Sequence, residues 1–255
     1  RDSQHSTPDG VQRAPKSGHG CGSRSPGNPV WHDCQISLSP PLALTTVGLI
    51  DYGMGNLHSV KTCFARLGQA ITPVSSPKDL QRCDALILPG VGAFDPAMER
   101  LRHTGLVPHL AEWGRLDRPL LGICLGLQLL FESSEEGDSR GLGLFKGSVR
   151  RLPSGQGERI PHMGWAKLER CNPNPLLPAG EQSPWVYFVH SFAAHPVDET
   201  DLAANVGFGN DVATAMVWHG RVGACQFHPE KSGQAGAVLL THWLSWLHAG
   251  APLPA

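Results

Sequence analysis

The order of apolar segments along the chain predicts an α/β protein with a mostly parallel central sheet flanked by helices. Strand-like runs at 47–52, 84–90 and 119–124 alternate with segments in which apolar residues recur at helical spacing. This β-α-β order is typical of a parallel sheet covered by helices on both faces. After about residue 140 strands follow one another directly, so we expect additional antiparallel strands in the C-terminal half.

Two helical segments and one weaker strand separate the predicted parallel strands. Residues 70–76 predict the weaker strand, and residues 98–113 predict helical structure interrupted near Pro108, because proline lacks the helical N–H. The first helix carries apolar residues at helical spacing, namely Leu57, Val60, Phe64 and Leu67.

The C-terminal half reads as successive strands closed by a helix. The predicted strands lie at 141–152, 161–170, 184–192 and 201–208, followed by a hairpin over 213–228 that turns at His219 and Gly220. The closing helix is indicated by apolar residues at i, i+3, i+4 and i+7, namely Leu240, Trp243, Leu244 and Leu247.

The first 44 residues differ in composition from the rest of the chain. Ser, Gly and Pro recur there with one aromatic residue and no hydrophobic period, so residues 1–44 are expected to form a disordered tail and 45–251 one domain. Because the chain begins at Arg1 rather than Met, the tail is also read as a translated upstream stretch or a truncated leader. An organellar transit peptide is a weaker alternative, since its acid-poor composition conflicts with Asp2, Asp9 and Asp33.

Composition excludes several classes of partner. The 21 Lys and Arg residues are balanced by 22 Asp and Glu residues, so no positive field attracts nucleic acid or an anionic membrane. No apolar run reaches the 18 residues typical of a membrane span. Seven scattered cysteines without a C-x-x-C pair argue against a disulfide framework or a structural zinc site, and they favour a reducing cytoplasm.

No cofactor is expected either. Gly53 and Gly55 follow the first strand as in a dinucleotide fold, but His58 stands where the third glycine belongs and no acid follows the next strand. We therefore expect no nucleotide cofactor, and the cysteine spacing leads us to expect no metal. Asn56 in this loop is either a partner contact or a turn residue.

Cys124 is the strongest candidate for a catalytic residue. It stands where the strand at 119–124 turns into a helix, between Gly122 and Gly126, and unpaired N–H groups at a helix start favour a thiolate. The glycines would allow a tight bend and close approach of a substrate. A lone apolar cysteine is by default a packing residue.

The segment CQFHPEKS supplies what a cysteine nucleophile needs. His228 can act as the general base, and Glu230 can hydrogen-bond its other ring nitrogen and fix the tautomer. Pro229 between them restricts the backbone. We expect folding to join these residues to Cys124, which lies 104 positions before His228.

A glycine-rich loop follows the strand at 84–90, at the edge of the sheet where Cys124 also lies. In PGVGAF, Gly90 and Gly92 around Val91 would let a backbone N–H point at a developing oxyanion, with the Leu125 N–H as second donor. Taken alone, this loop is an ordinary strand-to-helix turn. His190 and Ser191, where another strand ends, are expected either to line the pocket or to be structural.

Together these motifs resemble the class I (triad) glutamine amidotransferases, and among them the glutaminase subunits of imidazole glycerol phosphate synthase. The resemblance covers about residues 47–250 through DYGMGN, PGVGAF, GICLGLQLLFESSEEG, PHMGW, YFVHSF and FHPEKSG. It implies hydrolysis of L-glutamine, with the ammonia passing to a (β/α)₈ cyclase partner in histidine biosynthesis. It also implies that Cys124 is the nucleophile, His228 the base and Glu230 its orienter.

The resemblance implies further roles and one departure. Gln128 would be a glutamine-site residue, and Ala166 stands where the family usually has Asn. A partner would dock over the active edge of the sheet, at Asn56, Met163, Trp165 and Lys231. The alternatives are a glutaminase subunit of an anthranilate or pyridoxal phosphate type synthase, and a non-catalytic scaffold subunit on the same fold.

Overall fold

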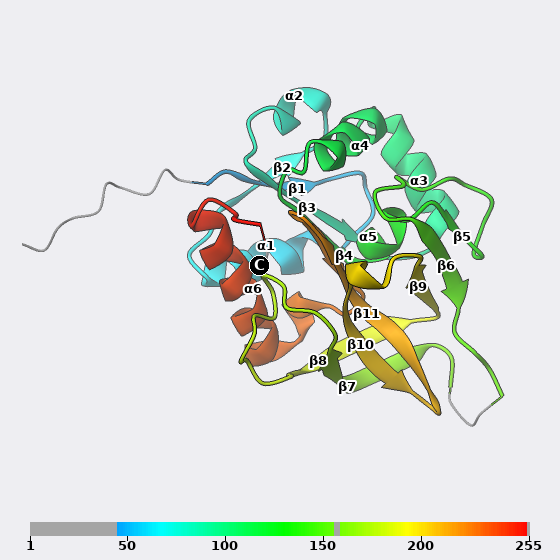
Figure 1. The fold of residues 1–255 in the computed structure, drawn as a ribbon. Coiled ribbons are helices and arrows are strands. Elements are labelled where there is room, and N and C mark those ends of the chain that lie inside the picture. The colour runs from blue at the N-terminus through cyan, green and yellow to red at the C-terminus, as the bar shows by residue number, and fades with distance from the viewer. Residues whose placement is uncertain (1–44, 156–158, 254–255) are drawn as a thin grey trace, which may run out of the picture. The chain divides into compact units, whose positions relative to one another are not determined.

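The computed structural model describes residues 45–155 and 159–253 (Figure 1). The tail predicted at 1–44 lies outside the described residues. No helix in the described part is long and apolar enough to cross a membrane.

The described residues form a nine-stranded sheet that is parallel at one side and antiparallel at the other, which confirms the predicted fold class. Its strand order is β2-β1-β3-β4-β12-β11-β10-β7-β8. The parallel strands are β1 (Val47–Ile50), β2 (Ile71–Val74), β3 (Ala85–Gly90), β4 (Leu120–Cys124) and β12 (Val222–Cys225). The antiparallel part consists of β11 (Asp211–His219), β10 (Leu202–Phe208), β7 (His162–Arg170) and β8 (Trp185–His190).

Strand β12 joins the two halves of this sheet. It pairs antiparallel with β11, as expected for the hairpin, but parallel with β4, where Cys225 lies opposite Ile123. The chain that leaves β12 therefore runs beside the end of β4. This register brings the segment 226–230 to the place where Cys124 ends its strand.

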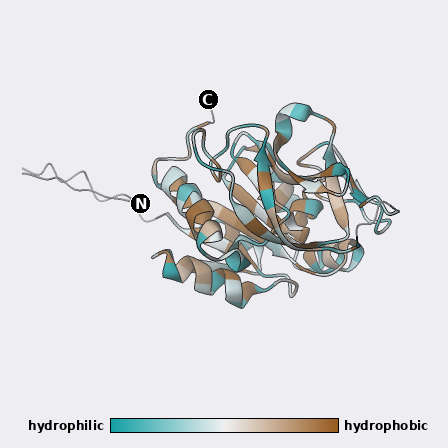
Figure 2. Ribbon diagram, turned by 90° about the horizontal axis from the view of Figure 1, so that it is seen from below, coloured by the Kyte–Doolittle hydropathy of each residue, from teal (hydrophilic) through white to brown (hydrophobic). Residues whose placement is uncertain are grey.

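Helices cover both faces of the sheet, and each face has its own apolar core (Figures 1 and 2). One core includes Phe64 of α1 (Leu57–Arg66) and Trp243 of α6 (Gly233–His248), whose rings meet edge-on. The other face carries α3 (Phe94–His103), α4 (Val107–Arg115) and α5 (Leu125–Leu129). A short helix, α2 (Pro77–Leu80), precedes β3.

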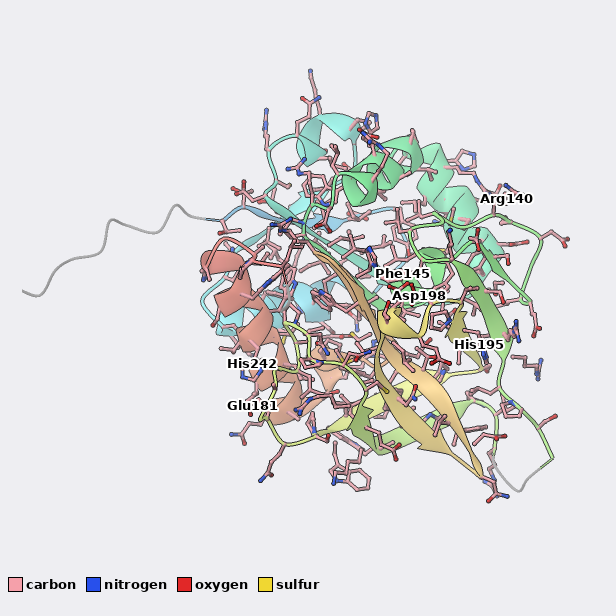
Figure 3. The ribbon with its side chains drawn as sticks, in the orientation of Figure 1. Arg140, Phe145, Glu181, His195, Asp198 and His242 are labelled. Atoms are coloured by element: carbon pink, nitrogen blue, oxygen red, sulfur yellow. The ribbon has the colours of Figure 1, made fainter. Side chains whose placement is uncertain are left out.

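Smaller elements complete the fold. A three-stranded sheet contains β5 (Ser133–Ser134), β6 (Gly147–Arg151) and β9 (Phe192–Pro196), and 3-10 turns lie at Glu199–Asp201 (η1) and Pro229–Lys231 (η2). On the outer side of α6, His242 lies near Glu181 of the loop before β8, with 3.9 Å between Nε2 and Oε1 (Figure 3).

The predicted interruption near Pro108 is confirmed, but its cause differs, and the single strand predicted over 184–192 is wrong. The break within 98–113 falls at residues 104–106, and Pro108 lies in the first turn of α4, where a missing N–H breaks no helical hydrogen bond. The single strand expected over 184–192 is divided at Ser191. β8 pairs with β7 in the large sheet, whereas β9 pairs with β6 in the small one, so the chain changes sheets at this residue.

Candidate active site

Cys124 occupies a strained backbone position between β4 and α5. Its φ of 55° and ψ of −112° lie outside the regions that side chains other than glycine usually adopt, a strain typical of functional sites. The sharp bend is therefore made by Cys124 itself, whereas neither Gly122 nor Gly126 has a positive φ. Gly126 is needed for packing instead, because a Cβ there would lie 1.9 Å from the carbonyl oxygen of Leu88 in β3.

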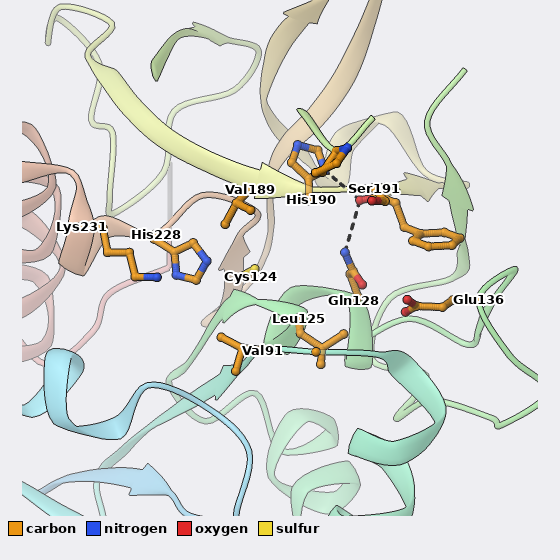
Figure 4. A pocket seen from close by; sticks show the side chains of 13 residues that line it. Val91, Cys124, Leu125, Gln128, Glu136, Val189, His190, Ser191, His228 and Lys231 are labelled. Carbon is orange, nitrogen blue, oxygen red and sulfur yellow. Dashed lines mark hydrogen bonds between the residues drawn. The ribbon is translucent and has the colours of Figure 1, made fainter. Parts of the chain in front are cut away.

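His228 and Glu230 lie directly beyond β12 and form a buried pair. His228 Nδ1 lies 2.7 Å from Glu230 Oε1, with 3% and 2% of the two side chains exposed. The His228 backbone is also held in place, since its N–H donates to the carbonyl of Tyr187 and its carbonyl accepts from the Ser232 hydroxyl. Because Glu230 occupies Nδ1, the Nε2 side of the ring is left for Cys124, which lies beside it in Figure 4.

The surroundings of His228 favour its protonated form. Burial lowers the pKa of this imidazole, but hydrogen bonds with Cys124 and Glu230 outweigh burial and raise the pKa to about 9. At neutral pH the pair therefore holds a proton on His228, next to the sulfur. A proton held there can be given to a leaving group.

A cavity of about 440 Å³ opens in front of Cys124 (Figure 4). The structure brings most of the predicted site residues to its wall. Those residues are Val91, Gly92, Cys124, Leu125, Gln128, His190, Ser191, His228 and Lys231.

The glycine-rich loop lies beside the nucleophile, as expected. Gly90 ends β3 and lies opposite Cys124 in the register. Gly90 itself is buried and does not line the cavity, whereas Val91 and Gly92 do. A Cβ at Gly90 would come within 2.9 Å of Leu125 Cβ, so only glycine allows this loop to approach the start of α5 so closely. Gly92 has a φ of 98°, which a side chain would oppose.

Two polar residues of the site were missed from the sequence. Glu136 lines the cavity, and its carboxylate accepts a hydrogen bond of 2.9 Å from the N–H of Phe94. Gln226 is fully buried, and its Nε2 lies 3.8 Å from Cys124 Sγ. Glu136 stands in a segment that carries the resemblance, and Gln226 directly precedes another. A Glu among polar residues and a Gln between apolar ones give no signal of their own.

His190 is a buried neutral histidine on the same wall. Burial lowers its pKa to about 4, so its ring is uncharged at neutral pH. Its Nδ1 lies 2.8 Å from the carbonyl oxygen of Phe192, which can only accept, so Nδ1 carries the proton. The other nitrogen, Nε2, then accepts from His162 Nδ1 at 3.1 Å.

The residues predicted for a partner interface differ in their surroundings. Met163 and Trp165 of β7 are 62% and 53% exposed. Asn56 caps α1, because its side chain accepts from the N–H of Ser59. Lys231 belongs to the cavity wall, and Ala166 is half-buried against the core.

The part of the chain that the structure describes contains no group of three or more His, Cys, Asp or Glu residues placed to hold a metal ion. Its five cysteines, Cys63, Cys83, Cys124, Cys171 and Cys225, are free thiols.

A strained cysteine, a buried His–Glu pair and a mixed sheet define a class of enzyme, and comparison with known proteins gives the same class. Residues 48–244 match the sequence pattern of the glutamine amidotransferase class-I family, and the chain belongs to that family. A solved glutamine amidotransferase has the same fold, with a TM-score of 0.62 and 22% identity over 80% of this chain and 99% of that one. PurLQS from Thermotoga maritima gives a TM-score of 0.63 at 19% identity over 80% of this chain and 100% of that chain.

Closer relatives identify the group within this family. The chain is 64% identical to imidazole glycerol phosphate synthase subunit HisH 2 of Prochlorococcus marinus (strain MIT 9313), over 83% of this chain and 100% of that protein. It is also 64% identical to subunit HisH of Synechococcus sp. (strain CC9605), over 82% of this chain and 98% of that protein. The chain groups with the HisH subunits, which confirms the resemblance seen in its motifs.

Proposed function

We propose that this chain hydrolyses L-glutamine to L-glutamate and ammonia through a thioester on Cys124. The ammonia passes to a cyclase subunit, which makes imidazole glycerol phosphate and an aminoimidazole carboxamide ribotide in histidine biosynthesis. The observation that carries the proposal is the meeting of a strained cysteine with a buried His228–Glu230 pair at one cavity. Two segments distant in sequence thus supply the nucleophile, the base and the orienting group that a cysteine hydrolase requires.

The reaction follows from where the protons lie. The Cys124 sulfur attacks the carboxamide carbon, a C–S bond forms, and the carbonyl electron pair moves onto oxygen. When this intermediate collapses, the C–N bond breaks and the His228 imidazolium protonates the departing nitrogen, which leaves as ammonia. His228 then takes a proton from water, whose oxygen attacks the thioester. The C–S bond breaks, and L-glutamate leaves.

Backbone N–H groups beside Cys124 are the candidates to stabilise the oxyanion. The Leu125 N–H begins α5, and the loop at Gly90, Val91 and Gly92 lies against it. Two such donors around a developing negative charge stabilise a tetrahedral intermediate.

The cavity also offers groups that suit the amino-acid end of glutamine. Glu136 supplies a carboxylate on the wall opposite His228, as Figure 4 shows, and it can accept from an α-ammonium group. Gln128 donates through Nε2 to the Phe192 carbonyl and to Gln226 Oε1. Both donors of this amide are therefore used inside the protein, and Gln128 has only Oε1 to offer a substrate.

Ammonia needs a sheltered route, because in neutral water it is mostly protonated and no longer nucleophilic. A cyclase subunit docked over the cavity would provide that shelter. In β7 and β8, Met163 lies opposite Val189 and Trp165 opposite Tyr187. Residues opposite each other in a sheet share a face, and Val189 lines the cavity. The exposed side chains of Met163 and Trp165 therefore extend the rim of the cavity with an apolar surface.

A reducing compartment such as the cytoplasm suits this chemistry, since Cys124 must stay a free thiol.

The proposal is tested by comparing two nitrogen sources in the assembled synthase. Cys124→Ala should abolish glutamine-dependent synthesis and leave ammonium-dependent synthesis at the parent level, because only the ammonia source is lost. Cys171→Ala is the matched control and should change neither rate, because Cys171 is an exposed cysteine that directly follows β7 and does not line the cavity. Glutamine-dependent synthesis retained by Cys124→Ala would refute the assignment.

A further inference from the structure

A second polar side chain besides His228 reaches the sulfur of Cys124. Gln226 and His228 flank Phe227, which is fully buried and packs edge-on against Phe188. While Phe227 packs into the core, both polar neighbours contact Cys124. The sequence Gln-Phe-His after β12 thus brings two hydrogen-bonding groups to one sulfur.

The Gln226 amide is fully buried, and this burial requires hydrogen-bond partners. Its backbone N–H donates to the Ala215 carbonyl, its Oε1 accepts from Gln128 Nε2 at 3.0 Å, and its Nε2 donates to Cys124 Sγ at 3.8 Å. A fully apolar side chain at position 226 would fill the same space without burying an amide. A polar residue here therefore calls for a role beyond packing.

The direction of the amide is fixed by a backbone carbonyl. The Phe192 carbonyl can only accept, so the end of Gln128 that faces it at 3.2 Å must be the NH₂ group. The same NH₂ group then faces Gln226 and must meet its oxygen, because a flipped Gln226 would place two donors against each other. Gln226 is left with its NH₂ group towards Cys124.

We propose that Gln226 is a further catalytic residue, which donates an N–H to the Cys124 sulfur and stabilises it as a thiolate before attack on the substrate. An N–H directed at a thiolate favours the charged form, and the donor acts from a second direction besides the His228 imidazolium. Gln128 acts through Gln226 as a positioning residue. The inference deepens the proposed function and rests on Cys124 being its nucleophile.

The test is the pH dependence of Cys124 alkylation by iodoacetamide, read by mass spectrometry on the peptide that contains Cys124. Gln226→Met keeps the volume and removes the donor, and it should move the pH midpoint of alkylation up by about one unit. Gln226→Glu keeps the shape and adds a like charge, so its midpoint should rise at least as far. Gln182→Met makes the same chemical change at an exposed site and should leave the midpoint unchanged.

Thermal melting identifies which variants fold, and glutamine hydrolysis with the cyclase subunit present should fall about tenfold or more in the folded ones. A folded Gln226→Met or Gln226→Glu protein with the parent midpoint would overturn the inference, even if its melting temperature fell, because Gln226 would then serve packing alone. If Gln226→Met does not fold, the near-isosteric Gln226→Glu decides. A parent protein that alkylates normally but never hydrolyses glutamine would refute the proposed function, and with it a catalytic role for Gln226, whereas a raised midpoint in Gln226→Met would then show only that Gln226 stabilises the Cys124 thiolate.

Discussion

His228 Nδ1 and Glu230 Oε1 lie 2.7 Å apart, and the two side chains are almost completely removed from solvent. One 3-10 turn carries the carboxylate, so the pair is built within three consecutive residues. The His228 ring is thereby held with Nε2 towards Cys124. The buried carboxylate also helps to keep His228 protonated, because it is among the groups that raise the pKa of the ring to about 9.

Glu230→Gln keeps the shape of the pair and removes its charge. Glutamine-dependent synthesis should fall by about a hundredfold or more, because without the carboxylate charge the His228 imidazolium is no longer stabilised for its part in proton transfer. The pKa of His228 should fall as well, which would shift the pH profile of hydrolysis to lower pH. Glu181→Gln is the control, since it alters an exposed carboxylate near His242, and an equal loss in both variants would contradict the account.

The strained backbone at Cys124 predicts an unusual order of stabilities. Alanine usually stabilises a chain relative to glycine, but at a φ of 55° and a ψ of −112° glycine avoids the strain. Cys124→Gly should therefore be more stable than Cys124→Ala by about 1 kcal/mol. Urea unfolding of the two variants measures this difference in the free energy of unfolding. If Cys124→Ala were the more stable variant, the backbone strain at position 124 would have to be released when the sulfur is removed.

Buried His190 predicts a loss of stability in acid. Its pKa falls to about 4 in the folded chain, whereas an unfolded histidine titrates near 6.5, so between these values the unfolded chain binds more protons. The free energy of unfolding should thus decrease as pH falls from 6.5 to 4, by up to about 3 kcal/mol from this group.

Urea unfolding at pH 4.5 to 6.5 measures this slope. His195, whose pKa burial also lowers, contributes in the same direction, so the test compares slopes between variants. His190→Asn should flatten the dependence, and His109→Asn at an exposed position should not. The same slope in the parent and His190→Asn proteins would show that His190 is protonated when folded.

The exposed rim predicts where the cyclase subunit docks. Trp165→Ala should weaken binding by about tenfold or more, because a large aromatic side chain at an interface contributes strongly when buried. Leu116→Ala is the matched control and should bind as the parent does. Leu116 is an exposed apolar residue that follows α4 and precedes β4, near the amino-terminal end of that strand, whereas Cys124 lies at its carboxyl end. Binding measured by calorimetry decides, and equal losses in both variants would move the interface elsewhere.

Much of this architecture could be predicted from the sequence, because alternating apolar periods determine a parallel sheet and flanking helices. The strand at 119–124 and the helix from Leu57 are examples. The parallel pairing of β12 with β4 could not be predicted, since hairpin periodicity says nothing about the strand on the other side. The change of sheet at Ser191 was missed because apolar residues resume directly after it, at Phe192, so 184–192 was taken as one strand.

The site shows a similar division. Cys124, His228 and Glu230 carry chemistry in their residue types, so they could be found before the structure. The role of the glycines beside Cys124 was misread, because close contact between Gly126 and Leu88 depends on tertiary packing. Gln226 was missed because its role depends on tertiary contacts. The Phe192 carbonyl fixes the orientation of the Gln128 amide, and the Gln128 amide in turn fixes the orientation of the Gln226 amide.

The central claim is that hydrolysis proceeds through a thioester on Cys124. The most direct measurement is rapid acid quenching of the chain and cyclase subunit during glutamine turnover, followed by mass spectrometry of the peptide containing Cys124. The account predicts that this peptide gains the mass of one γ-glutamyl group, which disappears when glutamine is exhausted and never forms in Cys124→Ala. Glutamine turnover in the Cys124→Ala protein, or a glutamyl group found on another residue during turnover, would contradict it.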